Sequence, residues 1–296
     1  MCGIISAETN NNIGTASTAF NCRYLPVKIT DESGQIIDTN TGILYAAQKG
    51  AQVINCSFGS TEFSQVEADL ITYITDSLDV LVIASAGNNG LNIPIYPASL
   101  LNVIGVCATD EMDVKIPISN YHSSFDISAP GTSIYAPSIE NYYSSKSGTS
   151  VSAAVVSSAA ILLRSYFVLE NANQIKYRLL STTDYIDDIN PLYSSRLGTG
   201  RLNLLNAFSE IKKTPLSITP NPSNGGFDLQ LELPNYGNYQ ISIFDVLGKL
   251  YHRTDFFARS KTYSEHLNLQ DIKQGYYTIE VIGVSYKNSS GIIIVK

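Results

Sequence analysis

Three short apolar runs in the first half of the chain constrain its fold more than any other feature. They span residues 53–56, 80–84 and 103–106, and the first two end shortly before Gly59 and Gly87. Runs that are apolar on both faces of a strand suit a parallel sheet that is covered on both sides. We therefore expect a parallel sheet at the centre of this part of the chain.

Two helices are expected beside these runs. Residues 42–49 form one candidate, which Gly50 would end. Between the first two runs, apolar residues recur at spacings of three and four, as they do on one face of a helix. These residues are Phe63, Val66, Leu70, Tyr73 and Ile74. Strands that alternate with helices indicate the α/β class.

The pattern changes near residue 215. A cluster of turn-forming residues at 220–226 precedes segments in which apolar and polar side chains alternate. The alternating apolar residues are Leu229, Leu231, Leu233, Ile241, Ile243, Tyr277, Ile279 and Val281. Period-two alternation with frequent turns predicts a small all-β sandwich of the immunoglobulin-like kind. We place a first domain at 1–208, a linker at 209–216 and the sandwich at 217–296.

Composition excludes several functions. The formal net charge is −7 and there is no basic run, which argues against nucleic acid and anionic membranes as partners. The longest apolar stretches are too short to form a transmembrane segment. The N-terminus lacks the basic and apolar regions of a signal peptide.

The four cysteines are widely spread. No CxxC pair occurs, so a zinc site is not expected. Cys56 and Cys107 lie in apolar runs, and we expect them to be buried as small apolar residues. A disulfide between the remaining two, Cys2 and Cys22, is left open.

Ser150 stands at the start of a long run of small and apolar residues that extends to Leu163. This run predicts a buried helix with Ser150 at its N-terminus. The free N–H groups and the positive dipole end of such a helix stabilise negative charge that develops on a substrate carbonyl oxygen. The alternative is that Ser150 only caps the helix.

Asn88 follows the second apolar run, in the segment Gly87-Asn88-Asn89-Gly90. It is expected at the carboxyl end of a parallel strand, where α/β folds bind ligands. Its side-chain amide could donate a hydrogen bond to an oxyanion. The alternative is a turn residue that tolerates a left-handed conformation.

Together, and in this order, the two segments resemble the oxyanion and serine motifs of the subtilase family of serine peptidases. Four further segments resemble that family's sequence, and the resemblance covers residues 1–208. They are residues 53–60, residues 96–106, residues 126–131 and residues 198–203.

The resemblance implies a three-layer subtilisin-like fold and a serine endopeptidase that cleaves polypeptide substrates. It makes Ser150 the nucleophile, with Asn88 and the backbone N–H of Ser150 as oxyanion donors. The walls of the substrate cleft would be Ser57, Phe58, Gly59, Ser85 and Gly87. Backbone in this cleft would pair with an extended peptide.

The mechanism also needs a histidine base and an aspartate that orients it. In the family both precede the serine, and residues 1–7 resemble the end of the histidine motif. Of the three histidines, His252 and His266 fall in the sandwich, and His122 lies in a polar loop where we expect it to be exposed. We expect the chain to be a fragment that lacks the first part of the sheet, the histidine and the aspartate, and to be inactive as given.

The chemistry requires no cofactor. Residues 9–15 resemble a loop that holds calcium in many subtilases, with Asn11 as the side-chain ligand. Oxygen donors at alternating positions suit calcium. The alternative is a solvated polar turn.

Residues 217–296 resemble the C-terminal sorting domain of type IX (Por) secretion, from the turn cluster at 220–226 to the terminal Lys296. The resemblance implies passage through the periplasm, recognition by the type IX machinery, and a secreted or cell-surface product. The alternative is a carbohydrate- or protein-binding sandwich. The sequence shows no ordered aromatic platform for such binding, but Tyr236, Tyr239 and Tyr263 are left unexplained.

Two other functions are weighed against a secreted peptidase. The first is a non-catalytic secreted subtilase-like binding or cargo protein with the same fold. The second is a nucleotide-binding α/β domain, which the glycine-rich turn at 87–90 suggests. No GxGxxG or Walker motif supports the second.

Overall fold

The computed structural model describes residues 1–138, 142–208, 216–233, 236–246, 248–269, 272–283 and 286–296. The chain divides into two compact units, Met1–Ser209 and Glu210–Lys296. Residues 209–215 of the expected linker lie outside the described residues.

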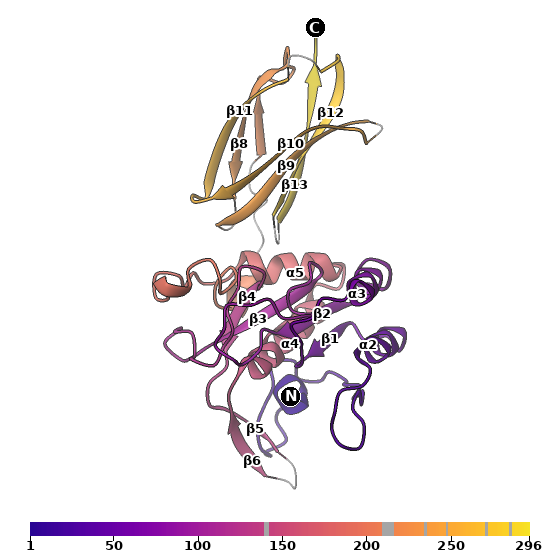
Figure 1. The fold of residues 1–296 in the computed structure, drawn as a ribbon, viewed down its shortest axis with the longest axis vertical. Coiled ribbons are helices and arrows are strands. Elements are labelled where there is room, and N and C mark those ends of the chain that lie inside the picture. Colours follow the sequence, from indigo (N-terminus) through magenta and orange to yellow (C-terminus); the bar gives the residue numbers. More distant parts are fainter. Residues whose placement is uncertain (139–141, 209–215, 234–235, 247, 270–271, 284–285) are drawn as a thin grey trace. The chain divides into compact units, whose positions relative to one another are not determined.

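A four-stranded parallel sheet lies at the centre of the first unit, as the apolar runs predict (Figure 1). Its strands, in spatial order, are β1 (Val53–Cys56), β2 (Leu81–Ser85), β3 (Val103–Thr109) and β4 (Ile127–Pro130). All residues of β2 and β3 are buried, because both faces of the sheet are covered.

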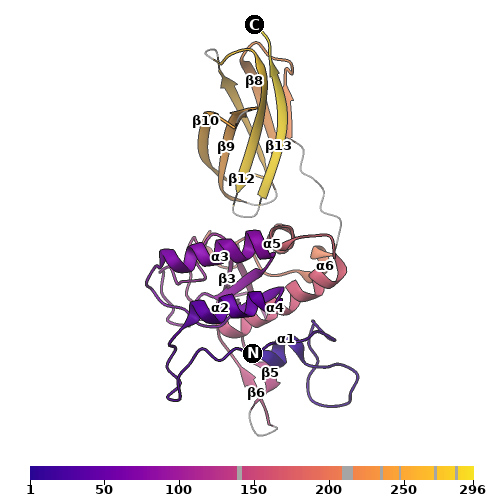
Figure 2. The ribbon, with the colours of Figure 1, turned by 90° about the vertical axis from the view of Figure 1, so that its right-hand side faces the viewer.

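Helices cover the two faces of this sheet, so the unit has three layers (Figure 2). On one face lie α2 (Thr39–Gln48) and α3 (Gln65–Leu78), and on the other α4 (Thr149–Tyr166) and α5 (Ala172–Ser181). The remaining elements are α1 (Cys2–Ser6), β5 (Ile134–Pro137), β6 (Tyr143–Lys146), η2 (Pro191–Tyr193) and α6 (Leu204–Ala207). The expected α/β fold is confirmed.

The helix starts differ from the expected ones because of capping side chains. The Asp38 carboxylate accepts the Thr41 N–H, so α2 starts before the predicted residue 42. The Ser64 hydroxyl accepts the Glu67 N–H, and α3 starts after Phe63. Phe63 is instead exposed and packs edge-on against Tyr96.

A buried ion pair joins α5 to the sheet. Lys176 Nζ lies 3.7 Å from Asp126 Oδ1, and both side chains are less than a tenth exposed. Lys176 Nζ also donates to the carbonyls of Leu101 and Val103, and Asp126 Oδ2 accepts the Gly105 N–H. Burial raises the pKa of Asp126 and lowers the pKa of Lys176.

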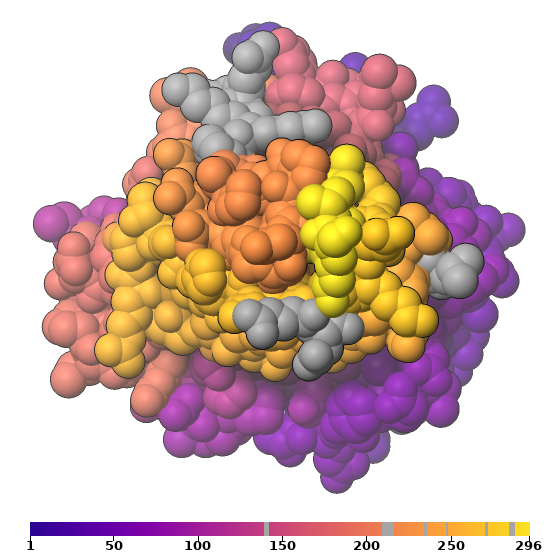
Figure 3. Space-filling model, turned by 90° about the horizontal axis from the view of Figure 1, so that it is seen from above, coloured from indigo at the N-terminus to yellow at the C-terminus, as the bar shows by residue number. Residues whose placement is uncertain are grey.

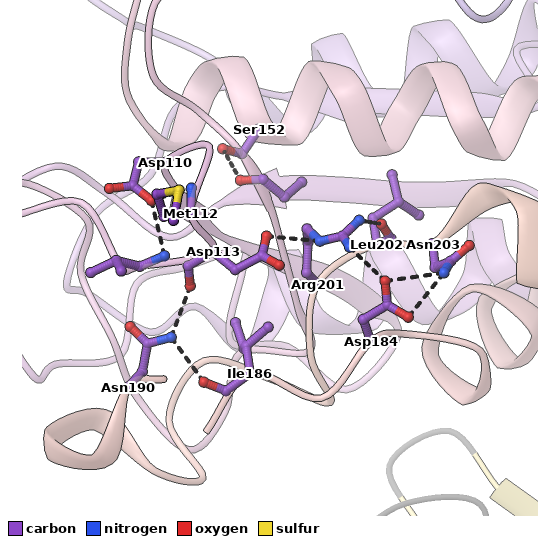
Figure 4. Close-up of polar contacts among 12 residues, drawn as sticks. Asp110, Met112, Asp113, Ser152, Asp184, Ile186, Asn190, Arg201, Leu202 and Asn203 are labelled. Atoms are coloured by element: carbon purple, nitrogen blue, oxygen red, sulfur yellow. Dashed lines mark hydrogen bonds and ion pairs between the residues drawn. The ribbon is translucent and has the colours of Figure 1, made fainter. Parts of the chain in front are cut away.

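A second polar cluster is centred on Arg201, from the segment 198–203 (Figure 4). Arg201 Nε lies 2.8 Å from Asp113 Oδ1, and Arg201 Nη2 lies 2.5 Å from Asp184 Oδ2. Asn203 Nδ2 donates to both oxygens of Asp184, and Asn190 Nδ2 donates to the Asp113 carbonyl. The cluster ties the end of the first unit to the turn that follows β3.

The second unit consists of two antiparallel sheets. One has the order β11 (Thr262–Asn268), β8 (Gly226–Glu232) and β7 (Leu216–Thr219). The other has the order β10 (Leu250–Ala258), β9 (Gly237–Asp245), β12 (Gly275–Gly283) and β13 (Tyr286–Ile294). All eight alternating apolar residues from the sequence are buried, so the sandwich prediction is confirmed.

An aromatic stack joins strands of both sheets. The Phe256 ring on β10 lies 3.7 Å from the Tyr263 ring on β11 and 5.7 Å from the Tyr239 ring on β9, centroid to centroid. Tyr239 is 5% exposed. Tyr239 and Tyr263 therefore belong to the packing of the sandwich rather than to an exposed platform.

The last strand is joined to the segment between β7 and β8. The Ser223 N–H donates to the Ile293 carbonyl, and the Val295 N–H donates to the Ser223 carbonyl, both at 2.8 Å. Ser223 and Ile294 form a parallel bridge, and Figure 3 shows the yellow end of the chain beside orange residues of the second unit. Ser223 is 2% exposed and Ile294 is 1% exposed.

All four cysteines are free, and Cys56 and Cys107 are buried as expected. Burial raises the pKa of the Cys56 thiol to about 12. In the described part of the chain, no helix is both long and apolar enough to cross a bilayer.

Candidate active site

Ser150 is the second residue of α4. The N-cap of this helix is Gly148, which has no side chain to cap it, so the alternative that Ser150 is the cap is wrong. The Val151 and Ser152 N–H groups donate to the Gly148 carbonyl, at 3.0 and 3.3 Å, and the Thr149 N–H donates to Asn88 Oδ1. Of the N–H groups at the start of α4, only that of Ser150 has no acceptor among the described residues, so it is available to another acceptor.

Gly148 permits a close approach to Asn88. Its φ of 126° is a conformation that other residues rarely adopt, and a Cβ there would lie 3.0 Å from Asn88 Oδ1. The Gly148 N–H donates to the Gly131 carbonyl at 2.7 Å, which anchors the start of α4 beside β4.

The Asn88 side chain is held in one orientation by Thr149. Its Oδ1 accepts the Thr149 N–H at 2.9 Å and the Thr149 hydroxyl at 3.0 Å. Thr149 Oγ1 in turn accepts the Gly87 N–H at 3.1 Å. Since Oδ1 is occupied, Nδ2 is the free donor of the amide, and no acceptor among the described residues takes its protons.

The Ser150 hydroxyl is half-buried and only weakly engaged. Its Oγ donates to the Ser57 carbonyl at 3.4 Å, while Ser57 Oγ donates to the Ser150 carbonyl at 3.2 Å. Asn55 Nδ2 donates to Ser57 Oγ at 2.9 Å. These bonds place the end of β1 against the start of α4, and the Ser150 hydroxyl stays half-buried.

The other expected cleft residues lie at the ends of β1 and β2. Ser57, Phe58 and Gly87 are half-buried and Gly59 is exposed, whereas Ser85 is only 4% exposed. Next to Gly59, Ser60 and Tyr96 exchange two backbone hydrogen bonds, at 2.9 and 2.8 Å. A Cβ at Gly59 would lie 2.8 Å from the Tyr96 carbonyl oxygen, so this approach requires glycine.

None of the three histidines is hydrogen-bonded to Ser150 in the described residues. His122 was expected to be exposed, but it is half-buried, and its Nδ1 lies 2.8 Å from Ser124 Oγ. Burial and then the Arg196 charge lower the pKa of His122. In the second unit, His252 contacts Thr254 and His266 contacts Asp228.

Asn11 lies in an exposed turn, where its Oδ1 accepts the Ile13 N–H at 3.0 Å. The Thr15 hydroxyl is buried and has no hydrogen-bond partner among the described residues. The described residues contain no group of three or more His, Cys, Asp or Glu side chains that could hold a metal.

Sequence reasoning missed the role of Thr149. Thr149 stands in the same Gly-Thr-Ser segment as Ser150, so the motif itself pointed to this residue. That its hydroxyl and N–H orient Asn88 becomes visible only when β2 and α4 are placed together.

Two family profiles match the chain. The subtilase family matches residues 1–208, and the secretion system C-terminal sorting domain matches residues 217–296. Thermitase of Thermoactinomyces vulgaris is 37% identical over 207 residues, which cover 69% of this chain and 72% of that protein. The thermophilic serine proteinase of Bacillus sp. (strain AK1) is also 37% identical over 207 residues, and here the chain spans only 50% of the relative's length.

Solved structures give the same result. A patellamide maturation protease, PatA, aligns with a TM-score of 0.62 at 31% identity, covering 67% of this chain and 78% of that one. A protease from Pseudoalteromonas arctica PAMC 21717 aligns with a TM-score of 0.63 at 25% identity, covering 69% and 68%.

Proposed function

The chain belongs to the subtilase family over residues 1–208, and on this premise we propose that it carries the serine part of the active site of a secreted serine endopeptidase. The observation that carries this proposal is the arrangement of Asn88 around Thr149. These hydrogen bonds tie the Asn88 amide to Thr149, the residue next to Ser150 in the chain, which supports Ser150 as the attacking residue.

In the proposed reaction, Ser150 Oγ attacks the carbonyl carbon of a peptide bond and loses its proton to a general base. The carbonyl oxygen becomes an oxyanion, which accepts hydrogen bonds from Asn88 Nδ2 and the Ser150 N–H. Collapse of the tetrahedral intermediate expels the amine with a proton from the same base and leaves an acyl-enzyme. Water then hydrolyses the ester.

The base and its orienting carboxylate are proposed to be a histidine and an aspartate outside these 296 residues. The three histidines present are engaged elsewhere, and none reaches Ser150 in the described part of the chain. We therefore expect this polypeptide by itself to be inactive.

The substrates are proposed to be polypeptides in extended conformation. Ser57, Phe58 and Gly87 are half-buried and Gly59 is exposed, and the backbone of these residues is proposed to pair with the substrate as with an added strand. Because Ser85 is almost fully buried, it would contribute to the wall of the site without a large contact to the substrate.

The second unit indicates secretion or attachment to the cell surface, because it matches the C-terminal sorting domain. We propose the type IX secretion machinery as its partner. A competing role as a non-catalytic cargo or binding protein would share this route and differ only in the chemistry at Ser150.

A structural calcium at residues 9–15 is proposed as a separate point. The Thr15 hydroxyl, buried and without a partner in the described part of the chain, and Asn11 Oδ1 are hard oxygen donors of the kind that calcium prefers. If the site exists, chelation lowers the melting temperature of the purified chain and added calcium restores it. An unchanged melting temperature would remove the site.

The main test compares the 296-residue polypeptide with the product of the same gene read from its upstream codons. A fluorophosphonate probe should label the longer protein and spare its Ser150→Ala variant. Ser147→Ala is the matched control, since Ser147 is an exposed serine three residues earlier in the chain. Equal labelling of wild type and Ser150→Ala removes Ser150 from its role, and an inert longer protein favours the non-catalytic alternative.

A further inference from the structure

Asn120 is a fully buried polar residue that the proposed chemistry does not use. It lies in the connection between β3 and β4, and it is 0% exposed. A buried amide must find hydrogen-bond partners, because water does not reach it. All the side-chain partners of Asn120 lie in the segment 86–91, which carries Asn88.

The Asn120 side chain makes three hydrogen bonds to the backbone on both sides of Asn88. Its Nδ2 donates to the Ala86 carbonyl at 3.0 Å. Its Oδ1 accepts the N–H of Asn89 at 3.1 Å and the N–H of Leu91 at 2.9 Å. The side-chain amide of Asn120 thus fixes one carbonyl group and two N–H groups of the segment 86–91.

The backbone around Asn120 continues this contact. The Asn120 N–H donates to the Gly87 carbonyl at 3.0 Å, and the Gly90 N–H donates to the Ile118 carbonyl at 2.8 Å. The Tyr121 N–H donates to the Leu91 carbonyl at 3.0 Å. Residues 118–121 therefore act as a support along the whole Asn88 segment.

The Asn88 segment needs such a support. Gly87 and Gly90 have φ values of 94° and 70°, so glycine occupies both sides of the asparagines and leaves the segment conformationally permissive. The support is also tight, because a Cβ at Gly87 would lie 2.5 Å from Asn120 Nδ2. Asn88 itself is exposed, so its position depends on how its neighbours are held.

We propose that Asn120 is the positioning residue of the oxyanion donor: it holds residues 86–91 in the conformation in which Asn88 Oδ1 meets Thr149 and Asn88 Nδ2 faces the carbonyl attacked by Ser150. The part of this statement that concerns catalysis rests on the proposed function. The part that concerns the orientation of Asn88 can be measured on the chain without any activity.

The structural test uses amide hydrogen exchange by NMR. The Thr149 N–H is bonded to Asn88 Oδ1, so its protection reports the orientation of the Asn88 side chain. In Asn120→Ala we expect the amides of Asn89, Leu91 and Thr149 to exchange at least about tenfold faster than in wild type. Unchanged protection of Thr149 would overturn the proposal, whatever happens to overall stability.

Asn190→Ala is the matched control. Asn190 is also a buried asparagine, 2% exposed, with three side-chain hydrogen bonds to backbone, and none of them goes to residues 86–91. This variant should expose the Lys115 amide, which Asn190 Oδ1 accepts, and leave Thr149 protected. If the Thr149 amide lost the same protection in both variants, Asn120 would contribute only to overall stability and would not position Asn88.

If Asn120→Ala does not fold, Asn120→Asp decides the question. It keeps an acceptor for Asn89 and Leu91 and replaces only the donor to Ala86. The Asn89 and Leu91 amides should stay protected, and Thr149 exchange should lie between wild type and an Asn88→Ala reference. A Thr149 amide as protected as in wild type refutes the role of the donor.

The catalytic test uses the longer gene product. Asn120→Ala should lower kcat by about 10- to 100-fold, up to the limit set by loss of the oxyanion donor, with KM nearly unchanged. In an Asn88→Ala background it should cause no further loss, since both act through one group. Additive losses overturn the proposal. If wild type itself is inert, the proposed function fails, while the exchange experiment still decides the orientation of Asn88.

Discussion

Separating the two members of the buried pair Asp126–Lys176 should give two destabilised proteins with opposite responses to pH. The perturbations are Lys176→Met and Asp126→Asn. Each leaves one ionisable group in a site where both side chains are less than a tenth exposed. The double variant removes both charges, and the amide oxygen that it carries at position 126 can still accept the Gly105 N–H, as Asp126 Oδ2 does now.

The expected loss in the free energy of unfolding follows from the burial of the pair. Removal of one partner from a buried pair costs about 3–5 kcal/mol at neutral pH. In Lys176→Met the carbonyls of Leu101 and Val103 also lose their donor, which places this variant at the upper end. For a unit of this size each kcal/mol lowers the melting temperature by about 2–4 °C, so we expect drops of about 6–20 °C.

The pH responses differ in sign. In Lys176→Met the pKa of Asp126, already raised by burial, rises further, so the folded state binds a proton that the unfolded state releases. Stability is then greatest in acid and falls by about 1.4 kcal/mol per pH unit up to the raised pKa. In Asp126→Asn the pKa of Lys176 stays below its ordinary value, so stability rises with pH from that lowered pKa to about 10.4.

Scanning calorimetry at about pH 5, 7 and 9 measures these responses. The double variant should lose the pH dependence of both single variants and be more stable than either at neutral pH. Identical pH profiles for the two single variants, or a double variant as unstable as the sum of both, would refute the reasoning. Either result would mean that the two charges are solvated or do not interact.

Three further predictions follow from the site and the sandwich. In the longer gene product, Asn88→Ala should lower kcat by about 10²–10³ with little change in KM in peptide hydrolysis, a range known for oxyanion asparagines of this family. Gly148→Ala should destabilise the first unit by about 1–3 kcal/mol in calorimetry and speed exchange of the Thr149 amide, because its φ is 126° and its Cβ would approach Asn88 Oδ1. Phe227→Ala should cost about 3–5 kcal/mol, because Phe227 is 0% exposed. It should lower only the calorimetric transition of the second unit, which also assigns the two transitions; a shift in the other one would contradict the division into units.

The strands were predictable because their signal is local. Residues 53–56 are predicted and observed as β1, and the run at 80–84 differs from β2 by one residue at each end. A strand that is buried on both faces is apolar at nearly every position, so it stands in the sequence as a continuous apolar run. The alternation in residues 229–233 predicted the sandwich for the same reason.

The site was predictable only in part. The positions of Ser150 and Asn88 follow from a helix start and a strand end, and the structure places both where these elements meet. Their catalytic roles stay predictions. Asn120 gave no signal, because its bonds to Asn89 and Leu91 span 31 and 29 residues. Such contacts follow from the order of strands in the sheet, which a single sequence does not specify.

The two backbone hydrogen bonds of Ser223, to Ile293 and Val295, connect the two sheets of the sandwich. Ser223 lies between two strands of one sheet, and Ile293 belongs to the edge strand of the other. Removal of Val295 and Lys296 would take away the Val295 N–H that donates to the Ser223 carbonyl and would leave Ile294, which is 1% exposed, as the last residue. Ile293 and Val295 are 45% and 48% exposed, so a receptor for this end of the protein can reach them while Ile292 and Ile294 stay buried in the sandwich.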